Sequence, residues 1–130
     1  MAIEFSVILD DRPGSLARLG GVLGDAGINI EAIHGSSREG KGFVQFVASD
    51  AARAAAALTA AGIPYTRREV LIVKILDEPG TLGDLTLIMA TADVNIDAIY
   101  VTTRGDVVLG VDDLAGAIQI STGVAVMRPA

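Results

Sequence analysis

The sequence predicts an α+β protein made of two consecutive modules, each with the element order strand, helix, strand, strand, helix, strand. The first observation behind this prediction is an internal repeat. The segment Asp11-Arg12-Pro13-Gly14-Ser15-Leu16 recurs 66 positions later as Asp77-Glu78-Pro79-Gly80-Thr81-Leu82, and the alignment continues without a gap to Ile28-Asn29-Ile30 and Val94-Asn95-Ile96. The second observation is that strand patterns and amphipathic helix patterns alternate in the same order in both copies.

The elements of the first copy follow from its apolar spacing and its turn residues. Residues 3–9 alternate enough to form a strand. A helix is expected after Pro13-Gly14, with Ser15 in a capping position and a buried stripe of leucines. The remaining expected elements are a hairpin of residues 30–37 and 43–48, a helix at 51–61 capped by Asp50, and a strand at 65–68.

The second copy repeats this series with small differences. Residues 70–76 form an almost continuous apolar run rich in β-branched side chains, which indicates a central strand. Thr81 takes the place of Ser15 at the start of the next helix. The remaining expected elements are a hairpin of residues 96–103 and 107–111, tighter than the first one, a helix at 114–120 opened by Asp113, and a strand at 124–127.

We expect the modules to cover residues 1–68 and 69–130. The charged Arg67-Arg68-Glu69 separates them in place of a flexible linker, so they should pack rigidly. Each has a ferredoxin-like split β-α-β pattern, in which an antiparallel sheet carries its helices on one face. Open sheet edges need cover, and a mean hydropathy of +0.51 leaves surplus apolar surface. A homo-oligomer, most simply a dimer, is therefore expected.

The composition argues against several classes of function. A net charge of −6 and a pI near 4.5 oppose nucleic-acid binding, which depends on lysine and arginine. The absence of cysteine removes thiolate metal sites and thiol nucleophiles, and makes the cytoplasm the expected compartment. No apolar run is long enough to span a membrane, and Met1 leads into a strand without a signal-peptide pattern. With no metal, cofactor or catalytic constellation, we expect a protein that is not an enzyme.

Two isolated signals have ordinary structural explanations. Residues 35–42 resemble a phosphate-binding loop, but Gly42 stands where a serine or threonine must meet magnesium, and a strand follows instead of a helix. We interpret this segment as a hairpin tip. His34 is the only histidine, and Tyr100 replaces it in the second copy. It is expected at a strand edge or an interface.

The turn before the first helix of each copy has the chemistry to bind a zwitterion. Gly14 or Gly80 lets a ligand approach the backbone closely, and the unpaired N–H groups at the helix start favour a carboxylate. Asp11 or Asp77 can accept from an ammonium group. The alternative is that these aspartates only cap the turn while Ser15 and Thr81 close the helix.

Asn29 and Asn95 each lie between a helix end and a strand. Asparagine at such a position can adopt a left-handed conformation and bond to its own backbone, which makes a turn role the favoured interpretation. A place beside a ligand remains the alternative.

The combination of motifs resembles one family of regulatory modules. An apolar strand, Asp-x-Pro-Gly-[Ser/Thr]-Leu, an amphipathic helix and [Ile/Val]-Asn-Ile-[Glu/Asp]-Ala-Ile occur in this order twice. This resembles the ACT family, most strongly over residues 3–33 and 71–99, and implies an amino acid bound at a contact between modules. The candidate ligand-binding residues are Asp11, Arg12, Pro13, Gly14, Ser15, Leu16, Asn29 and Ile30, with Asp77, Gly80, Thr81, Leu82, Asn95 and Ile96 in the second copy.

One departure from the family pattern leaves alternatives open. Many amino-acid-binding members carry a further polar group before the Pro-Gly turn, where this chain has Leu9 and Ile75. A site in one copy only, a different ligand, or no ligand are all consistent with this difference.

The first hypothesis is a non-catalytic, allosteric protein that binds an amino acid or a related small metabolite between ACT-like modules. The alternative is a ligand-independent subunit that docks on an amino-acid biosynthetic enzyme, in the manner of acetolactate synthase regulatory subunits. The first copy has the longer hairpin, a helix containing Gly20, Gly21 and Gly24, and His34. We expect this copy to bind the ligand and the second mainly to build the assembly.

Overall fold

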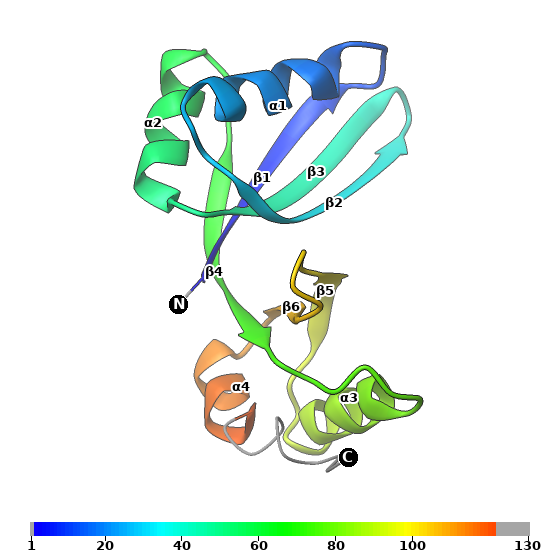
Figure 1. The fold of residues 1–130 in the computed structure, drawn as a ribbon. Helices are drawn as coiled ribbons and strands as arrows, with labels where there is room; N and C mark the ends of the chain where they lie inside the picture. The colour runs from blue at the N-terminus through cyan, green and yellow to red at the C-terminus, as the bar shows by residue number, and fades with distance from the viewer. Residues whose placement is uncertain (1, 122–130) are drawn as a thin grey trace. The chain divides into compact units, whose positions relative to one another are not determined.

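The computed structural model describes residues 2–121, which form six strands and four helices. Residues Ile3–Arg68 make one compact unit, the first unit, and the described residues from Glu69 onward, with Ala2, make the other, the second unit. Figure 1 shows the elements of each unit along the chain. The predicted last strand, residues 124–127, lies outside the described residues.

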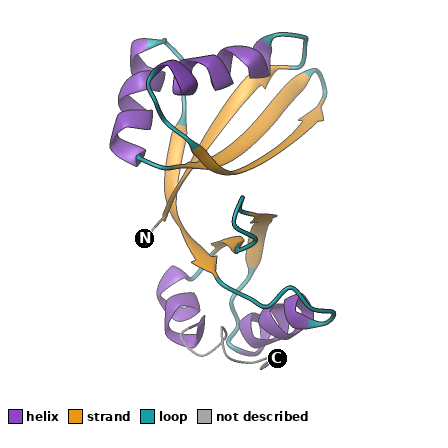
Figure 2. Ribbon diagram, in the orientation of Figure 1, coloured by secondary structure: helices purple, strands orange, loops and turns teal. Residues whose placement is uncertain are grey.

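The first unit has the complete strand, helix, strand, strand, helix, strand series that the sequence predicts. Its strands follow the order β2-β3-β1-β4, and its two helices cover one face of them (Figures 1 and 2). The central pairings, β1 with β3 and β3 with β2, are antiparallel. Its elements are β1 (Ala2–Asp10), α1 (Ser15–Asp25), β2 (Ile30–Arg38), β3 (Lys41–Ala48), α2 (Ala51–Ala60) and β4 (Thr66–Val73).

Aromatic and aliphatic side chains fill the space between this sheet and its helices. The rings of Phe5 and Phe46 stack with centroids 5.3 Å apart, and Tyr65 meets the edge of Phe5 at 5.4 Å. Leu19 and Leu23 of α1 pack into the same cluster, as the spacing of the leucines predicts. Leu16, the third member of the expected stripe, is instead 56% exposed at the start of the helix.

Two arginines join the two helices of the first unit. Arg18 of α1 donates from Nη2 to the carbonyl oxygen of Ala61, 2.6 Å away, just after α2. Arg53 of α2 donates to the carbonyl oxygen of Ala26, just after α1. Neither helix has a basic residue in its own last turn, so each receives from the other the positive charge that a helix C-terminus favours.

The second unit contains the end of β4 and four further elements, with strand order β4-β6-β5. Leu85, Met89 and Leu109 are fully buried in its core. Asp113 Oδ1 accepts from the backbone N–H of Gly116, as Asp50 Oδ1 does from Arg53, which confirms both predicted helix caps. The further elements are α3 (Thr81–Thr91), β5 (Ile96–Val101), β6 (Val107–Val111) and α4 (Leu114–Ser121).

The predicted interruption of the strands at Arg67-Arg68-Glu69 is wrong, although the two units do divide between Arg68 and Glu69. These residues lie inside one strand, β4, which begins in the first unit and ends in the second. Residues 65–68 and 70–76 were expected to form two separate strands. The charged side chains did not interrupt the strand because all three occupy exposed positions, from which Arg68 also reaches the Glu4 carboxylate.

The prediction that the second hairpin is the tighter one is also wrong. Glu39 and Gly40 alone connect β2 to β3, with φ of 53° and 77°, and Arg38 pairs directly with Lys41. Two successive positive φ values match the type I′ turn of a two-residue hairpin. The connection from β5 to β6 takes residues 102–106.

Candidate functional site

The turn between β1 and α1 depends on a left-handed glycine. Gly14 has φ of 94° and caps α1, which begins at Ser15 without any side-chain cap. The prediction that Ser15 caps the helix is therefore wrong, because the backbone of Gly14 takes that position. A side chain is strained at this φ, so the turn needs glycine there.

The second unit repeats the backbone conformation of this turn, but its Thr81 hydroxyl makes hydrogen bonds that the Ser15 hydroxyl does not make. Gly80 caps α3 with φ of 92°. The Thr81 hydroxyl donates to the carbonyl oxygens of Leu76 and Glu78, at 2.7 and 2.9 Å, and is almost fully buried. Thr81 thus fastens its turn without capping the helix. The Ser15 hydroxyl has no hydrogen bond within residues 2–121, so it remains available to a ligand.

The side chains of Asp11 and Asp77 do not cap their turns. The Asp11 backbone N–H bonds to the carbonyl oxygen of Gly40 at 3.0 Å. Neither carboxylate has a hydrogen bond or ion pair in the described part of the chain. The capping alternative for these two aspartates is therefore wrong, and both carboxylates are free to meet a ligand.

A hollow of about 430 Å³, here called the turn pocket, lies beside the first turn. Four candidate residues line it: Asp11, Arg12, Ser15 and Leu16. Pro13 and Gly14 line an adjoining hollow of about 450 Å³ together with Arg12 and Ser15. The remaining wall of the turn pocket, which the sequence motifs did not predict, includes Leu9, Ile33, Gly35, Ser37, Gly42 and Val44.

Asn29 and Ile30 lie away from this pocket. Asn29 precedes β2 and Ile30 begins it, at the far end of α1. This helix has 11 residues and spans roughly 16 Å. The Asn29 backbone N–H donates to Ser49 Oγ at 3.0 Å, and its carbonyl oxygen accepts from the Ser49 N–H at 2.8 Å. The structure thus separates these two candidates from the turn of their own unit.

The proposed left-handed conformation of Asn29 and Asn95 is wrong. The non-glycine residues with positive φ in the described chain are Glu39 and Asp93. Gly27, with φ of 71°, and Asp93, with φ of 59°, instead reverse the chain after α1 and α3. Each lies two residues before its asparagine, so the helix has already ended when the asparagine enters the strand.

The second unit has a hollow of about 490 Å³ at the corresponding turn. Asp77, Gly80, Thr81 and Leu82 line it, with Glu78 in the place of Arg12. Asn95 and Ile96 are absent from its lining, because the Asn95 N–H bonds to Asp112 Oδ1 at 2.9 Å at the other end of α3. The rest of its lining includes the side chains of Ile99, Tyr100, Val101 and Val107.

Asp10, at the rim of the turn pocket, is paired with two basic side chains. Lys41 Nζ donates to Asp10 Oδ1 at 2.8 Å, and Arg12 Nη2 lies 3.9 Å from Oδ2. The hydrogen bond from Lys41, then its charge, and then the charge of Arg12 hold the pKa of Asp10 below its ordinary value. Asp10 thus keeps Lys41 paired at the hairpin tip.

This ion pair gives the first unit a predictable response to acid. A carboxylate with a lowered folded-state pKa stabilises the fold above its unfolded-state pKa of about 4, and this contribution is lost as the pH falls through the folded-state pKa. Asp10→Asn should therefore be less stable than wild type at pH 7, and this difference should shrink as the pH falls below about 4. Urea melts at a series of pH values test this, and a difference that stays constant into acid would contradict the assignment.

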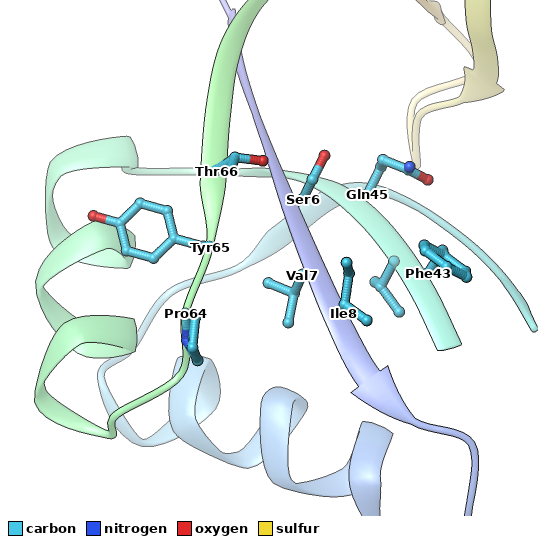
Figure 3. A pocket seen from close by; sticks show the side chains of 9 residues that line it. Ser6, Val7, Ile8, Phe43, Gln45, Pro64, Tyr65 and Thr66 are labelled. Atoms are coloured by element: carbon cyan, nitrogen blue, oxygen red, sulfur yellow. The ribbon is translucent and has the colours of Figure 1, made fainter. Parts of the chain in front are cut away.

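Another hollow of the first unit, of about 420 Å³, lies against β1, β3 and the start of β4 (Figure 3). Its lining mixes Ser6, Gln45 and Thr66 with the apolar side chains of Ile8 and Phe43, and Ile8 is 63% exposed. His34 lies nearby on the edge strand β2, as its position in the sequence predicts, with Nδ1 3.2 Å from Gln45 Oε1.

Within residues 2–121, no group of three or more histidine, aspartate or glutamate side chains is arranged to hold a metal ion. None of the described helices is long and apolar enough to cross a membrane.

Most of the first unit is similar in sequence to one known protein family. The ACT domain family model matches residues 3–63. The ACT match therefore includes the Pro-Gly turn, the turn pocket and the segment containing Asn29 and Ile30. No curated protein sequence matches the chain.

Solved structures resemble this chain over most of its length. A Bacteroides thetaiotaomicron protein superposes with a TM-score of 0.85 at 21% identity, covering 92% of this chain and 85% of its own. The ligand-free regulatory subunit of aspartate kinase from Thermus thermophilus gives 0.70 at 18%, with coverages of 95% and 89%. The corresponding subunit from Thermus flavus gives 0.66 at 17%, with coverages of 95% and 92%. At these identities the likeness is one of fold.

Proposed function

We propose that this chain is a non-catalytic regulatory protein that binds an amino acid or a related small metabolite at the turn pocket. The observation that carries the proposal is the joint presence there of the unengaged Asp11 carboxylate, the Arg12 guanidinium and the start of α1. The ACT match over residues 3–63 supports it, as does the fold shared with aspartate kinase regulatory subunits.

The groups at the turn suit the two charges of a zwitterion. The first N–H groups of α1 lack acceptors within the helix and lie at its positive end, where a carboxylate binds favourably. The Arg12 side chain is 73% exposed and can reach the same anion. Asp11 can accept hydrogen bonds from the ammonium group.

We assign binding to the first unit in preference to the second. In the first unit, Arg12 and a free Ser15 hydroxyl line the pocket. At the corresponding positions, the second unit places Glu78, which repels a carboxylate, and Thr81, whose hydroxyl is already bonded to the turn. The second unit serves the assembly in this proposal, and the modules are residues 1–68 and 69–130.

A neighbouring module completes the site in this proposal. Asn29 and Ile30 lie at the opposite end of α1 from the turn of their own module. They can therefore contact only a ligand that is bound at the turn of another module. We propose a homodimer in which a module of the partner protomer brings its asparagine to the turn pocket. The bound ligand then stabilises one arrangement of modules over another, which is the basis of regulation.

A paired substitution tests this function and its location. The purified protein is screened by thermal shift against the twenty proteinogenic amino acids and their precursors. A ligand at about 100 times its dissociation constant should stabilise the fold by about 2.7 kcal/mol. Asp11→Ala removes a hydrogen bond between charged groups, worth about 1.5–3 kcal/mol, and should weaken binding by about ten- to a hundredfold.

Asp77→Ala is the matched control, because Asp77 has the same place in the second turn. Calorimetric titration of this variant should give the wild-type affinity. Unchanged affinity in Asp11→Ala would show that the ligand binds elsewhere, and the absence of any response in the screen would refute the sensing function.

The alternative is a subunit that docks on an amino-acid biosynthetic enzyme without a ligand. The exposed apolar side chains of α3 favour it: Leu87 is 66% exposed and Leu82 is 47% exposed. Leu87→Ser should then abolish co-purification with a partner enzyme while leaving amino-acid binding unchanged. Amino-acid binding by the wild type without any partner would favour the first proposal.

A further inference from the structure

The floor of the turn pocket contains two glycines on the helix-covered face of the sheet. Gly35 on β2 pairs with Val44 on β3, which in turn pairs with Val7 on β1. Directly opposed residues of antiparallel strands point to the same face. Val7 and Val44 are buried in the core under the helices, so Gly35 faces that side too. In the next row Gly42 stands between Leu9 and Ser37.

Neither the backbone nor its neighbours requires glycine at position 35. Its φ is not positive, unlike that of Gly14. A Cβ at Gly35 would lie 3.8 Å from Val44 Cγ2 and 3.9 Å from the Phe43 carbonyl oxygen, which is ordinary contact. Glycine inside a strand weakens the strand, and it marks places where another group approaches closely.

The second unit shows what a side chain does at this place. Val101 lies 66 positions after Gly35, in the register of the internal repeat. It pairs with Val107 as Gly35 pairs with Val44. Val101 lines the hollow beside the second turn, so a side chain at this point of the strand faces that hollow. A valine at this point in the strand is therefore compatible with the fold.

We propose that Gly35 is a specificity-determining residue, and that its missing side chain provides the space for the side chain of a bound α-amino acid. This inference rests on the proposed function of the turn pocket. The ligand class is an uncharged amino acid with a side chain extending beyond Cβ. Leu16, Ile33 and Val44 present apolar surface around this space, and the Ser37 hydroxyl is the polar side chain in the same row as Gly42.

A size series tests the inference in the intact protein. Glycine, L-alanine, L-valine and L-leucine are titrated by calorimetry into wild type, Gly35→Ala and Gly35→Val. The wild type should bind L-valine or L-leucine more tightly than glycine. Gly35→Val should lose at least tenfold in affinity for the larger two and change little toward glycine, with Gly35→Ala between.

Gly20→Ala is the matched control, because Gly20 lies on the exposed side of α1 with no atom within 4 Å of an added Cβ. It should bind every ligand as the wild type does. Circular dichroism melts of both Gly35 variants should show a melting temperature no lower than that of the wild type.

The outcomes separate this inference from the function on which it rests. A wild type that binds none of the twenty amino acids would overturn the proposed function and the inference with it. A wild type that binds, while Gly35→Val retains its affinity or loses the same factor for every ligand, would overturn the inference alone.

Discussion

Replacing Phe46 with alanine should lower the free energy of unfolding by about 3–5 kcal/mol. Phe46 is fully buried at the centre of the first unit, with its ring stacked on Phe5. Removing the ring loses its transfer from water and leaves a cavity between the sheet and the helices. Since a domain has a total stability of about 5–15 kcal/mol, urea melts followed by circular dichroism should show a large fall in the midpoint.

Phe43→Ala is the control for this substitution, because it removes the same ring from the same strand. Phe43 is only partly buried, and the guanidinium of Arg38 lies 4.7 Å from the centre of its ring. Loss of this cation–π contact and of partial burial should cost about 1 kcal/mol. Equal losses in the two variants would show that the core of the first unit is not centred on Phe46.

Arg68→Ala should lower the free energy of unfolding by about 1–3 kcal/mol. Arg68 Nε donates to Glu4 Oε1 at 2.9 Å, and the Glu4 side chain is only 2% exposed. The substitution takes the guanidinium from a buried carboxylate, which raises the free energy of the folded state. The Arg68 side chain is 40% exposed, so solvent screening keeps the loss below that of a fully buried pair.

Two further variants isolate the electrostatic origin of this effect. Arg67→Ala removes the same side chain from the neighbouring, exposed position of β4 and should change stability by less than about 0.5 kcal/mol. Adding Glu4→Gln to Arg68→Ala removes the buried charge and should recover part of the loss. If the double variant recovers nothing, then packing rather than charge accounts for the effect.

The predictions that proved correct concern structure encoded within a few neighbouring residues. Asp50 and Asp113 precede their helices and cap them, as expected for acceptor side chains at these positions. Leu19 and Leu23 repeat at helical spacing and are buried. Each case depends on residues that lie within one or two helical turns of one another. The local sequence is therefore enough to predict it.

The errors at Ser15 and in β4 show where local patterns mislead. Ser15 is a favourable capping residue, but the left-handed Gly14 takes the cap and places Ser15 in the first turn of α1. The run Arg67-Arg68-Glu69 looks like a gap between two strands, but it lies within β4, and Arg68 has a partner 64 positions away in Glu4. A pattern in the chain cannot reveal this pair, because strand pairing brings the two residues together.

The sequence by itself determined the repeated Pro-Gly turns, the order of elements in the first unit and the residues Asp11, Arg12, Ser15 and Leu16 at its turn, because these depend on local backbone preferences and apolar spacing. Only the tertiary structure decided which distant residues complete the pocket. Antiparallel pairing puts Gly35, Gly42 and Val44 beside that turn, and the length of α1 places Asn29 at its other end. These distances depend on how strands and helices pack, so no short motif contains them.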